Sequence, residues 1–402
     1  MSQSKIVGAV EIGTTKTVVL VGEIVNGRSL NIVGMGQSSS AGVKKGEILD
    51  FRAASNATHA AIMGAEKSAG ATIEAIYLAQ TGRHLDGFAN NGSVTVSSAD
   101  GIVSKNDINR ATKEGKGKEL PAGRVYIHHI KNQVTLDGRA VEEPLRMQGQ
   151  RLDIGYWSIH GDERRVRDHI HVINGFGLPV EDMIISSIAT GSMVASEEEK
   201  KAGVLVLDIG CGTTDWVLYQ NGFITRTGVV AVGGDHFTND LALGLRINHR
   251  NAEKLKVQCG SAIMGKDDQT EKVWMVGDQM IGDRHIPKKA LIQIISARCE
   301  ELFSIIKKQL GDYCSVNALP AGVVITGGGS QLDGIVEAAS RGMGVEARIG
   351  QNPQWVMEEL RGPEFSTPLG LLHYALTGQH QEEFMVQEEK GILRKVVKMI
   401  SG

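Results

Sequence analysis

The 402-residue sequence lacks several features that would assign it to a familiar class. It has only four cysteines and no Cys-x-x-Cys pair, which argues against a disulfide framework or zinc site and suits a reducing cytosol. No apolar run approaches the roughly 20 residues that span a bilayer. The N-terminus reaches Glu11 after a short apolar run, so neither a signal peptide nor a membrane span is expected there. A formal net charge of −3 excludes a chain that binds nucleic acid electrostatically over its whole surface.

A Walker A motif is also absent, which argues against a P-loop fold. The length exceeds what one hydrophobic core usually serves, so we expect two or more domains. Glycine is abundant, with 50 residues, and many of these follow apolar runs in short polar turns. Phosphate-binding loops occur at such places, so the placement of the glycines directs the search for a site.

Two segments of the chain resemble each other, residues 6–23 and 203–222. Each is an apolar strand that ends in an acidic residue, followed by Ile-Gly, a Gly/Thr turn and a second β-branched strand. Glu11 in the first copy corresponds to Asp208 in the second. One copy alone could equally be a surface β-hairpin. Two copies with the acid in the same place predict facing hairpins that clamp one triphosphate.

The chemistry of these hairpins supports a phosphate site. Glycines let backbone N–H groups approach phosphate oxygens, and threonine hydroxyls add donors. Glu11 and Asp208 would be repelled by phosphate unless a divalent cation lay between, so they predict Mg²⁺ held through water. The same two carboxylates could orient an attacking water. We expect a slow Mg-dependent ATPase at most.

Three further segments fit a nucleotide site. Residues 229–245 read as a strand, a Gly-Gly turn and a helix opened by Asp235. Residues 322–335 read as a buried strand, a triple-glycine turn and the start of a helix, and such a turn lets adenine or ribose lie on the main chain. Residues 250–260 form a helical stretch that carries Glu253 and Lys256 on one face.

These residues resemble the actin/sugar-kinase/Hsp70 superfamily and, within it, the FtsA family of bacterial cell-division proteins. The FtsA-like motifs are Glu11 to Lys16, GGDHFTNDLA at 233–242, residues 81–94 and TPLGLLHYAL at 367–376. The likeness extends from residue 5 to about 378. It implies an α/β, actin-like fold of two RNase H-like domains with ATP and Mg²⁺ in the cleft.

The resemblance also implies which residues contact the nucleotide. Cys211 departs from the family pattern, because it stands where a glycine is usual. The implied residues are Gly13, Thr14, Thr15, Lys16, Gly210, Gly212, Thr213, Thr214, Gly233, Gly234, Asp235, Asn239, Glu253, Lys256, Gly327, Gly328 and Gly329.

The domain organisation follows from the same likeness. Residues 1–83 and 163–202 form subdomain 1A, 203–245 and 311–378 form 2A, 246–310 form 2B, and 379–390 form a linker. Residues 84–162 form an inserted subdomain, 1C, built of short strands around a basic helix, with an implied role in self-assembly and protein contact. Its His128-His129 pair faces opposite sides of a strand, so a half-buried strand explains it better than a metal site. The acidic run 197–199 is expected on a solvated loop.

The last segment, residues 391–402, has the pattern of an amphipathic helix that lies on an anionic membrane. Three cations occupy one arc and six apolar side chains the other: Ile392, Leu393, Arg394, Lys395, Val396, Val397, Lys398, Met399 and Ile400. The alternative is a terminal helix docked on the protein's own core. One such helix would bind weakly, and a filament would present many together.

The sequence therefore predicts an ATP-binding, actin-like cell-division protein that polymerises and tethers the FtsZ ring to the cytoplasmic membrane. The implied partners are an FtsZ-type tubulin homologue docking on residues 246–310, other division proteins, further copies of the chain and the anionic inner-membrane surface, with no nucleic acid. The implied location is the cytoplasmic face of the membrane at the division septum. A PilM-like pilus-assembly scaffold and a small-molecule kinase are the alternatives, although no segment is dedicated to the acceptor base that a kinase needs.

Overall fold

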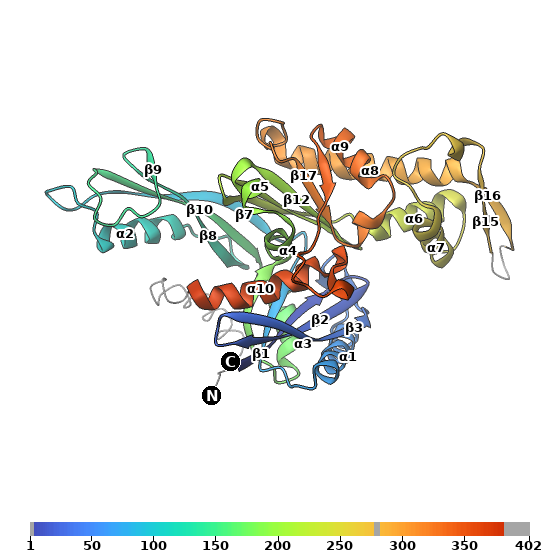
Figure 1. The fold of residues 1–402 in the computed structure, drawn as a ribbon, viewed down its shortest axis with the longest axis horizontal. Coiled ribbons are helices and arrows are strands. Elements are labelled where there is room, and N and C mark those ends of the chain that lie inside the picture. Colours follow the sequence, from blue (N-terminus) through green and yellow to red (C-terminus); the bar gives the residue numbers. More distant parts are fainter. Residues whose placement is uncertain (1–3, 277–281, 382–402) are drawn as a thin grey trace.

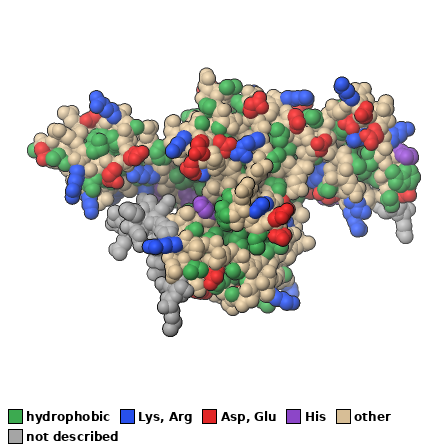
Figure 2. All heavy atoms as spheres, in the orientation of Figure 1, with side chains coloured by type: hydrophobic (Ala, Val, Ile, Leu, Met, Phe, Trp, Pro, Cys, Tyr) green, Lys and Arg blue, Asp and Glu red, His purple; other side chains and the backbone are tan. Residues whose placement is uncertain are grey.

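The computed structural model describes residues 4–276 and 282–381, and Figure 1 shows their arrangement. The predicted membrane-binding helix, residues 391–402, lies outside the described residues, and so does most of the predicted linker. No helix within the described ranges is long and apolar enough to cross a membrane. Figure 2 shows acidic and basic side chains interspersed over the visible face.

Two five-stranded sheets with the same topology form the centre of the molecule. In each, three antiparallel strands are followed by two parallel ones, so the repeat seen in the sequence corresponds to two copies of one sheet. The first, in the order β11-β6-β1-β2-β3, comprises β1 (Ser4–Ile12), β2 (Lys16–Val25), β3 (Ser29–Ser39), β6 (Ala75–Gln80) and β11 (Val180–Ile185). The second, in the order β14-β13-β12-β17-β18, comprises β12 (Val204–Ile209), β13 (Thr214–Gln220), β14 (Phe223–Val230), β17 (Val323–Thr326) and β18 (Ala347–Ile349).

Helices cover these sheets because the central strands are apolar on both faces. In β1, for example, Val7, Ala9 and Val10 are all fully buried. The helices are α1 (Phe51–Ala69), α3 (Glu163–Asn174), α4 (Ser186–Val194), α5 (Glu197–Ala202), α6 (Gly234–Leu245), α7 (His249–Cys259), α8 (Lys288–Leu310), α9 (Ile335–Met343) and α10 (Ser366–Gln381). The shorter elements are β4 (Val43–Lys44), β5 (Glu47–Ile48), β15 (Lys272–Met275), β16 (Arg284–Pro287), η1 (Asp267–Gln269), η2 (Gly311–Tyr313), η3 (Gly328–Gln331), η4 (Glu358–Leu360) and η5 (Pro363–Phe365).

Two of these helices, α4 and α10, pack against each other and join the two sheets. One continuous core contains Val7 of the first sheet, Val206 of the second and Leu372 of α10. Figure 1 shows α10 running between the two sheets. The expected α/β, two-domain, actin-like architecture is therefore confirmed for the described residues.

The inserted domain is a separate four-stranded sheet in the order β7-β10-β8-β9. It comprises β7 (Asp86–Thr95), α2 (Lys105–Lys116), β8 (Arg124–Leu136), β9 (Arg139–Val141) and β10 (Arg151–Asp162). The predicted basic helix is α2, which begins at a capping box formed by Ser104 and Asp107. The sheet has its own core, which includes Leu152, Ile154 and Tyr156.

The structure decides two local predictions, the orientation of the histidine pair and the conformation of the acidic run. His128 and His129 do point away from each other: His128 Nε2 accepts from the Ile185 N–H (3.4 Å), whereas His129 Nδ1 contacts Ser158 Oγ (2.9 Å). The solvated loop expected at residues 197–199 is wrong. These residues begin α5, because Ser196 and Glu199 form a capping box.

Candidate functional site: the cavity between two hairpins

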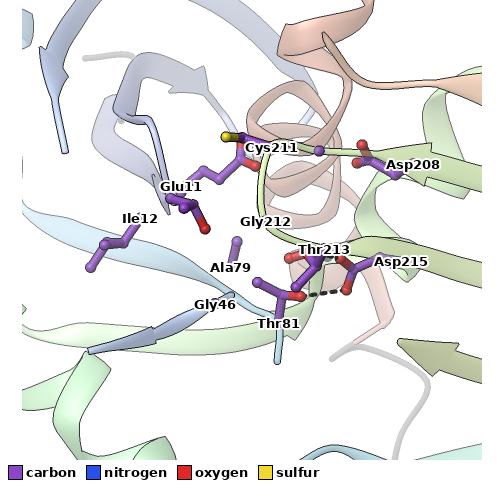
Figure 3. Close-up of a pocket in the computed structure, with 14 residues that line it drawn as sticks. Glu11, Ile12, Gly46, Ala79, Thr81, Asp208, Cys211, Gly212, Thr213 and Asp215 are labelled. Carbon is purple, nitrogen blue, oxygen red and sulfur yellow. Dashed lines mark hydrogen bonds between the residues drawn. The ribbon is translucent and has the colours of Figure 1, made fainter. Parts of the chain in front are cut away.

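The β1–β2 and β12–β13 hairpins face each other across a small cavity of about 60 Å³ (Figure 3). Its lining comes from both hairpins, from the end of β6 and from the start of α4. The lining residues are Glu11, Ile12, Gly13, Thr14, Gly46, Ala79, Thr81, Ser186, Asp208, Gly210, Cys211, Gly212, Thr213 and Asp215. The two repeated segments thus meet, as expected of a two-sided clamp.

Each hairpin is closed by the same tight turn. The Gly13 N–H donates to Lys16 O (3.0 Å) in the first, and the Gly210 N–H donates to Thr213 O (2.9 Å) in the second. The tips touch, and a side chain at Gly212 would collide with Thr14 Oγ1. Glycine at 212 therefore allows the close approach of the two domains.

The second hairpin is braced from behind by helix α6. The N–H groups of Gly234 and Asp235, at the start of α6, donate to the Gly210 and Cys211 carbonyls (both 2.9 Å). Lys256 Nζ donates to Gly234 O (3.0 Å). Several predicted nucleotide contacts thus support the hairpin, and they do not line the cavity.

Lys256 also connects α7 to α6. Its Nζ donates to Thr238 Oγ1 (2.8 Å) and to Glu253 Oε2 (2.7 Å). Glu253 and Lys256 therefore share a face, as their spacing predicts. Asn239 lies exposed on α6.

The glycine triplet follows β17 and abuts the second hairpin. Gly327 has φ +81°, and a side chain there would collide with Asp208 Oδ1. At Gly329 a side chain would collide with Ile209. A Cβ at Gly328 would meet nothing within 4 Å, so this backbone faces open space. The middle glycine therefore fits a ligand that lies directly on the main chain.

Three carboxylates surround the cavity, and their hydrogen bonds differ. Asp208 Oδ2 accepts from Thr190 Oγ1 of α4 (2.8 Å) and Thr367 Oγ1 of α10 (3.0 Å). Glu11 accepts no hydrogen bond from the residues that the structure describes, although it lies at the cavity wall. Asp208 is thus fixed to both connecting helices, whereas Glu11 is available.

The third carboxylate, Asp215, links the two domains. Thr81 Oγ1, after β6 of the first sheet, donates to Asp215 Oδ1 (2.6 Å). Thr213 Oγ1 donates to Asp215 Oδ2 (2.9 Å). Both bonds are drawn as dashed lines in Figure 3. The Thr81–Asp215 hydrogen bond therefore connects the first sheet to the second across the cleft.

Burial of these acids raises their proton affinity. Burial, together with the charges of Asp208 and Asp215, raises the pKa of Glu11 to about 8, and Lys16 opposes this. Burial and the Asp208 charge raise the pKa of Asp215 to about 7, against its threonine hydrogen bonds. Burial also raises the pKa of Asp208. Ionising these neighbouring buried carboxyls together is therefore costly, and a bound cation would lower that cost.

The residues fit a cation held through water better than one held directly. No group of three or more Asp, Glu, His or Cys side chains within the described ranges is placed to chelate a metal. Mg²⁺ keeps several of its waters in most protein sites, so separate carboxylates suit it. A cavity of about 60 Å³ is well below the 300–1,000 Å³ typical of ligand pockets. A nucleotide would therefore require the hairpin tips to separate.

The structure separates the predicted hairpin residues into two groups. Seven line the cavity: Glu11, Gly13, Thr14, Asp208, Gly210, Gly212 and Thr213. Thr15 is exposed, and Lys16 Nζ lies 5.1 Å from the centre of the Phe365 ring. Thr214 is fully buried and donates to Val232 O (2.8 Å), so it points away from the cavity.

Sequence reasoning missed other cavity residues, above all Thr81 and Asp215. One signal could have located Thr81. It follows the apolar run 75–80, which pairs in parallel with β1, and the carboxyl ends of neighbouring parallel strands meet at one edge of a sheet. Asp215 offered a weaker signal, an acid directly after the paired threonines.

Comparison with known proteins identifies the family of the chain. The family model of cell division protein FtsA matches residues 205–370, and that of the SHS2 domain inserted in FtsA matches residues 82–159. Cell division protein FtsA of Neisseria meningitidis is 34% identical over 400 residues, covering 97% of this chain and 95% of the relative. The FtsA of Pseudomonas aeruginosa is 31% identical, covering 94% and 91%.

Solved structures with low sequence identity share the fold. The PilM-PilN type IV pilus biogenesis complex matches with a TM-score of 0.63 at 15% identity, covering 94% of this chain and 99% of the other. MreB5 of Spiroplasma citri bound to ADP matches with a TM-score of 0.56 at 13% identity, covering 94% and 98%. The sequence relatives and both family models agree, and the chain belongs to the FtsA family of cell-division proteins.

Proposed function

We propose that this protein binds ATP with Mg²⁺ between its two hairpins, polymerises, and tethers the ring of an FtsZ-type tubulin homologue to the cytoplasmic face of the membrane at the division septum. Membership of the FtsA family supports the role in division. The observation that carries the nucleotide proposal is the set of three carboxylates with raised pKa values beside two facing glycine turns.

In this proposal the protein's own groups have separate tasks. The turns at Gly13 and Gly210 present main chain to phosphate oxygens, and the open face of Gly328 receives the nucleoside. Mg²⁺, when bound, would supply positive charge beside Glu11 and Asp208. The Thr81–Asp215 hydrogen bond keeps the domains together. We expect hydrolysis to be slow at most.

A nucleotide-bound structural neighbour favours the same use of the cleft. MreB5 of Spiroplasma citri shares this fold and was solved with ADP. The likeness to the PilM-PilN complex concerns the fold, and family membership favours division over pilus assembly. Nothing in the cavity favours the small-molecule kinase.

Exposed apolar side chains on neighbouring helices suit the docking of the tubulin homologue. Leu243 of α6 is 70% exposed and Val257 of α7 is 72% exposed. We expect Val257→Asp to abolish binding of an FtsZ C-terminal peptide in a pull-down. Val316→Asp is the matched control, because Val316 is 66% exposed in a turn outside helices α6 and α7. Equal peptide capture by wild type and Val257→Asp would contradict docking at α7.

Liposome co-sedimentation tests the tethering proposal. Three proteins are compared with and without Mg-ATP: the full chain, a chain that ends at Lys390, and the full chain with Arg394, Lys395 and Lys398 changed to Glu. We expect only the unaltered full chain to pellet with anionic vesicles, and more of it with ATP, because filaments present many tails together. If all three proteins stay in the supernatant, residues 391–402 do not bind the membrane and the tethering proposal is contradicted.

A further inference from the structure

A second cavity, of about 450 Å³, lies where the inserted domain meets the second main sheet. The β6–β7 turn, β8 and β10 form one side, and β13, β14 and α8 form the other. Figure 1 shows the inserted domain on the left of the view, with its sheet extending towards this junction. The volume lies within the range of small-molecule sites, 300–1,000 Å³. Unlike the cavity between the hairpins, this one is large enough for a ligand as it stands.

The lining of this cavity is cationic. Arg83, Arg124 and Arg226 face it, and Asp86 is the one carboxylate among its lining residues. Three positive charges and one negative charge leave a formal charge of +2. His84 adds none near neutral pH, because burial and nearby cationic groups lower its pKa to about 4.

Two of the arginines have no acidic partner. Within the described ranges, neither Arg83 nor Arg226 forms an ion pair with a carboxylate. Arg226 lies with its guanidinium 4.2 Å from the centre of the Tyr313 ring, which fixes its position without neutralising its charge. Arg226 is half-buried and Arg83 is exposed at the cavity rim. Guanidinium groups that face a cavity without a counterion favour the binding of an anion.

Arg124, the third arginine of the lining, is held in a position that suits the binding of an anion. Arg124 Nε donates to His160 Nδ1 (2.6 Å), and its Nη2 donates to His84 O (2.8 Å). Its Nη1 donates to no atom among the described residues, so one edge of the guanidinium remains available. A guanidinium positioned in advance binds phosphate with less loss of side-chain entropy than a mobile one.

Two tryptophans make the walls rigid. Trp157 and Trp216 are 3% and 4% exposed. The indole N–H of Trp157 donates to Thr227 Oγ1 and that of Trp216 to Gln309 Oε1, both at 3.0 Å. The cavity therefore has fixed walls on both domains.

We propose that this cavity binds a small, soluble phosphate monoester that bridges the inserted domain and the second main domain. A phosphate monoester carries about −1.5 to −2 charges at neutral pH, which matches the formal +2 of the lining. Arginine forks bind phosphate oxygens in pairs, and the three arginines come from the β6–β7 turn, β8 and β14. The proposal is independent of the nucleotide site between the hairpins.

Titration of the full chain with glycerol 3-phosphate tests this proposal by intrinsic tryptophan fluorescence and calorimetry at low salt. Two of the chain's four tryptophans line the cavity, which supplies a local signal. We expect saturable binding that Arg83→Ala and Arg226→Gln each weaken by roughly tenfold. Arg139→Ala, an exposed arginine on the same inserted domain, is the matched control and leaves the affinity unchanged.

Competition and stability measurements identify which ligand chemistry binds and at which site. Inorganic phosphate should compete with glycerol 3-phosphate, succinate should bind more weakly, and glycerol should not bind. Arg83 is exposed, so Arg83→Ala should keep the wild-type thermal unfolding. The proposal is overturned by absence of saturable binding, by equal affinity in the Arg83→Ala protein, by tighter binding of succinate, or by displacement of the phosphate ester by stoichiometric ATP.

Discussion

The two hairpins share a sequence pattern and a backbone, yet they use their acidic residues differently. Asp208 of the second hairpin accepts hydrogen bonds from Thr190 and Thr367. Glu11, its counterpart in the first hairpin, has no such bond among the described residues. A repeat in sequence therefore duplicated the strand-turn-strand geometry while the side-chain environments diverged.

The supports behind the two turns differ in the same way. Helix α6 braces the second turn through the Gly234 and Asp235 N–H groups. The first turn is attached to its own sheet, where the Ser40 N–H donates to Thr15 O (2.9 Å). The second turn is thus braced by a helix, whereas the first is held by the residue that follows β3, so we expect the first hairpin to respond more to what enters the cavity.

The largest expected effect comes from Asp208→Ala, which removes both a charge and a helix contact. We expect Mg-dependent nucleotide binding to be lost, with affinity reduced at least about tenfold for the missing charge. Asp208→Asn separates the two contributions, since its amide oxygen still accepts from both threonines. Titration with a fluorescent ATP analogue, with and without Mg²⁺, measures each. Unaltered affinity in the alanine protein would refute the role assigned to Asp208.

Glu11→Gln should have the next largest effect, and it should appear as a change in pH dependence. The pKa of Glu11 is raised from the model-compound value of 4.5 to about 8 in the folded protein. The folded state therefore holds a proton that the unfolded state has lost, and stability falls as pH rises from about 4.5 to about 8. Glu11→Gln should flatten this fall and raise stability at pH 8 without Mg²⁺ by up to a few kcal/mol.

Thermal and urea unfolding between pH 5 and pH 9 measure this difference, with and without Mg²⁺. Glu23→Gln, at the far end of the same hairpin, serves as the control and should follow the wild-type profile. We expect Mg²⁺ to stabilise wild type most at high pH, where Glu11 is ionised. A wild-type pH profile for Glu11→Gln would show that the carboxyl is not buried in the way described.

Thr81→Val should have the smallest effect, because it removes one hydrogen bond and keeps the side-chain shape. The Thr81–Asp215 bond joins the two domains, so the cleft should open more often at a cost to stability of about 0.5–1.5 kcal/mol. Hydrogen exchange at the ends of β6 and β13 measures this opening. Thr213→Val removes the bond within the second hairpin and should leave domain closure intact. Equal exchange in the two variants would contradict a cross-cleft role for Thr81.

Much of the fold could be predicted because the sequence marks it locally. Apolar strands that end in Glu11 and Asp208, each followed by Ile-Gly, specify hairpins that need no distant information. The basic helix of the inserted domain was also readable from pattern, whereas the segment at residues 367–376 was recognised only by its resemblance to the family. The capping box Ser196 to Glu199 was present in the sequence and identifies α5, although the acidic run suggested a loop.

The side-chain partners of the site were harder to predict. Thr190 and Thr367 lie on helices outside the hairpins, 18 and 159 residues from Asp208, and the packing of α4 against α10 brings them together beside it. Thr214 is instructive in another way. Thr214 is the first residue of β13 and its hydroxyl donates to Val232 O, whereas Thr213 lies in the turn before the strand and lines the cavity. The strand was visible in the sequence, whereas the side-chain contacts at its start were not.

The inserted domain enters and leaves the chain through paired strands, with Asp86 of β7 opposite His160 of β10. Its two ends are therefore neighbours. The outer part of the insert has a core of its own, whereas Ile127, Trp157 and Ile159 near the neck belong to the core of the first main domain. A segment joined in this way can be exchanged as a unit, since a replacement that ends in two adjacent strands leaves the path of the remaining chain unaltered. Chimaeras between relatives can accordingly be spliced at this neck, provided that the replacement supplies apolar side chains at the positions of Ile127, Trp157 and Ile159. The two facing hairpins lie outside the exchanged segment.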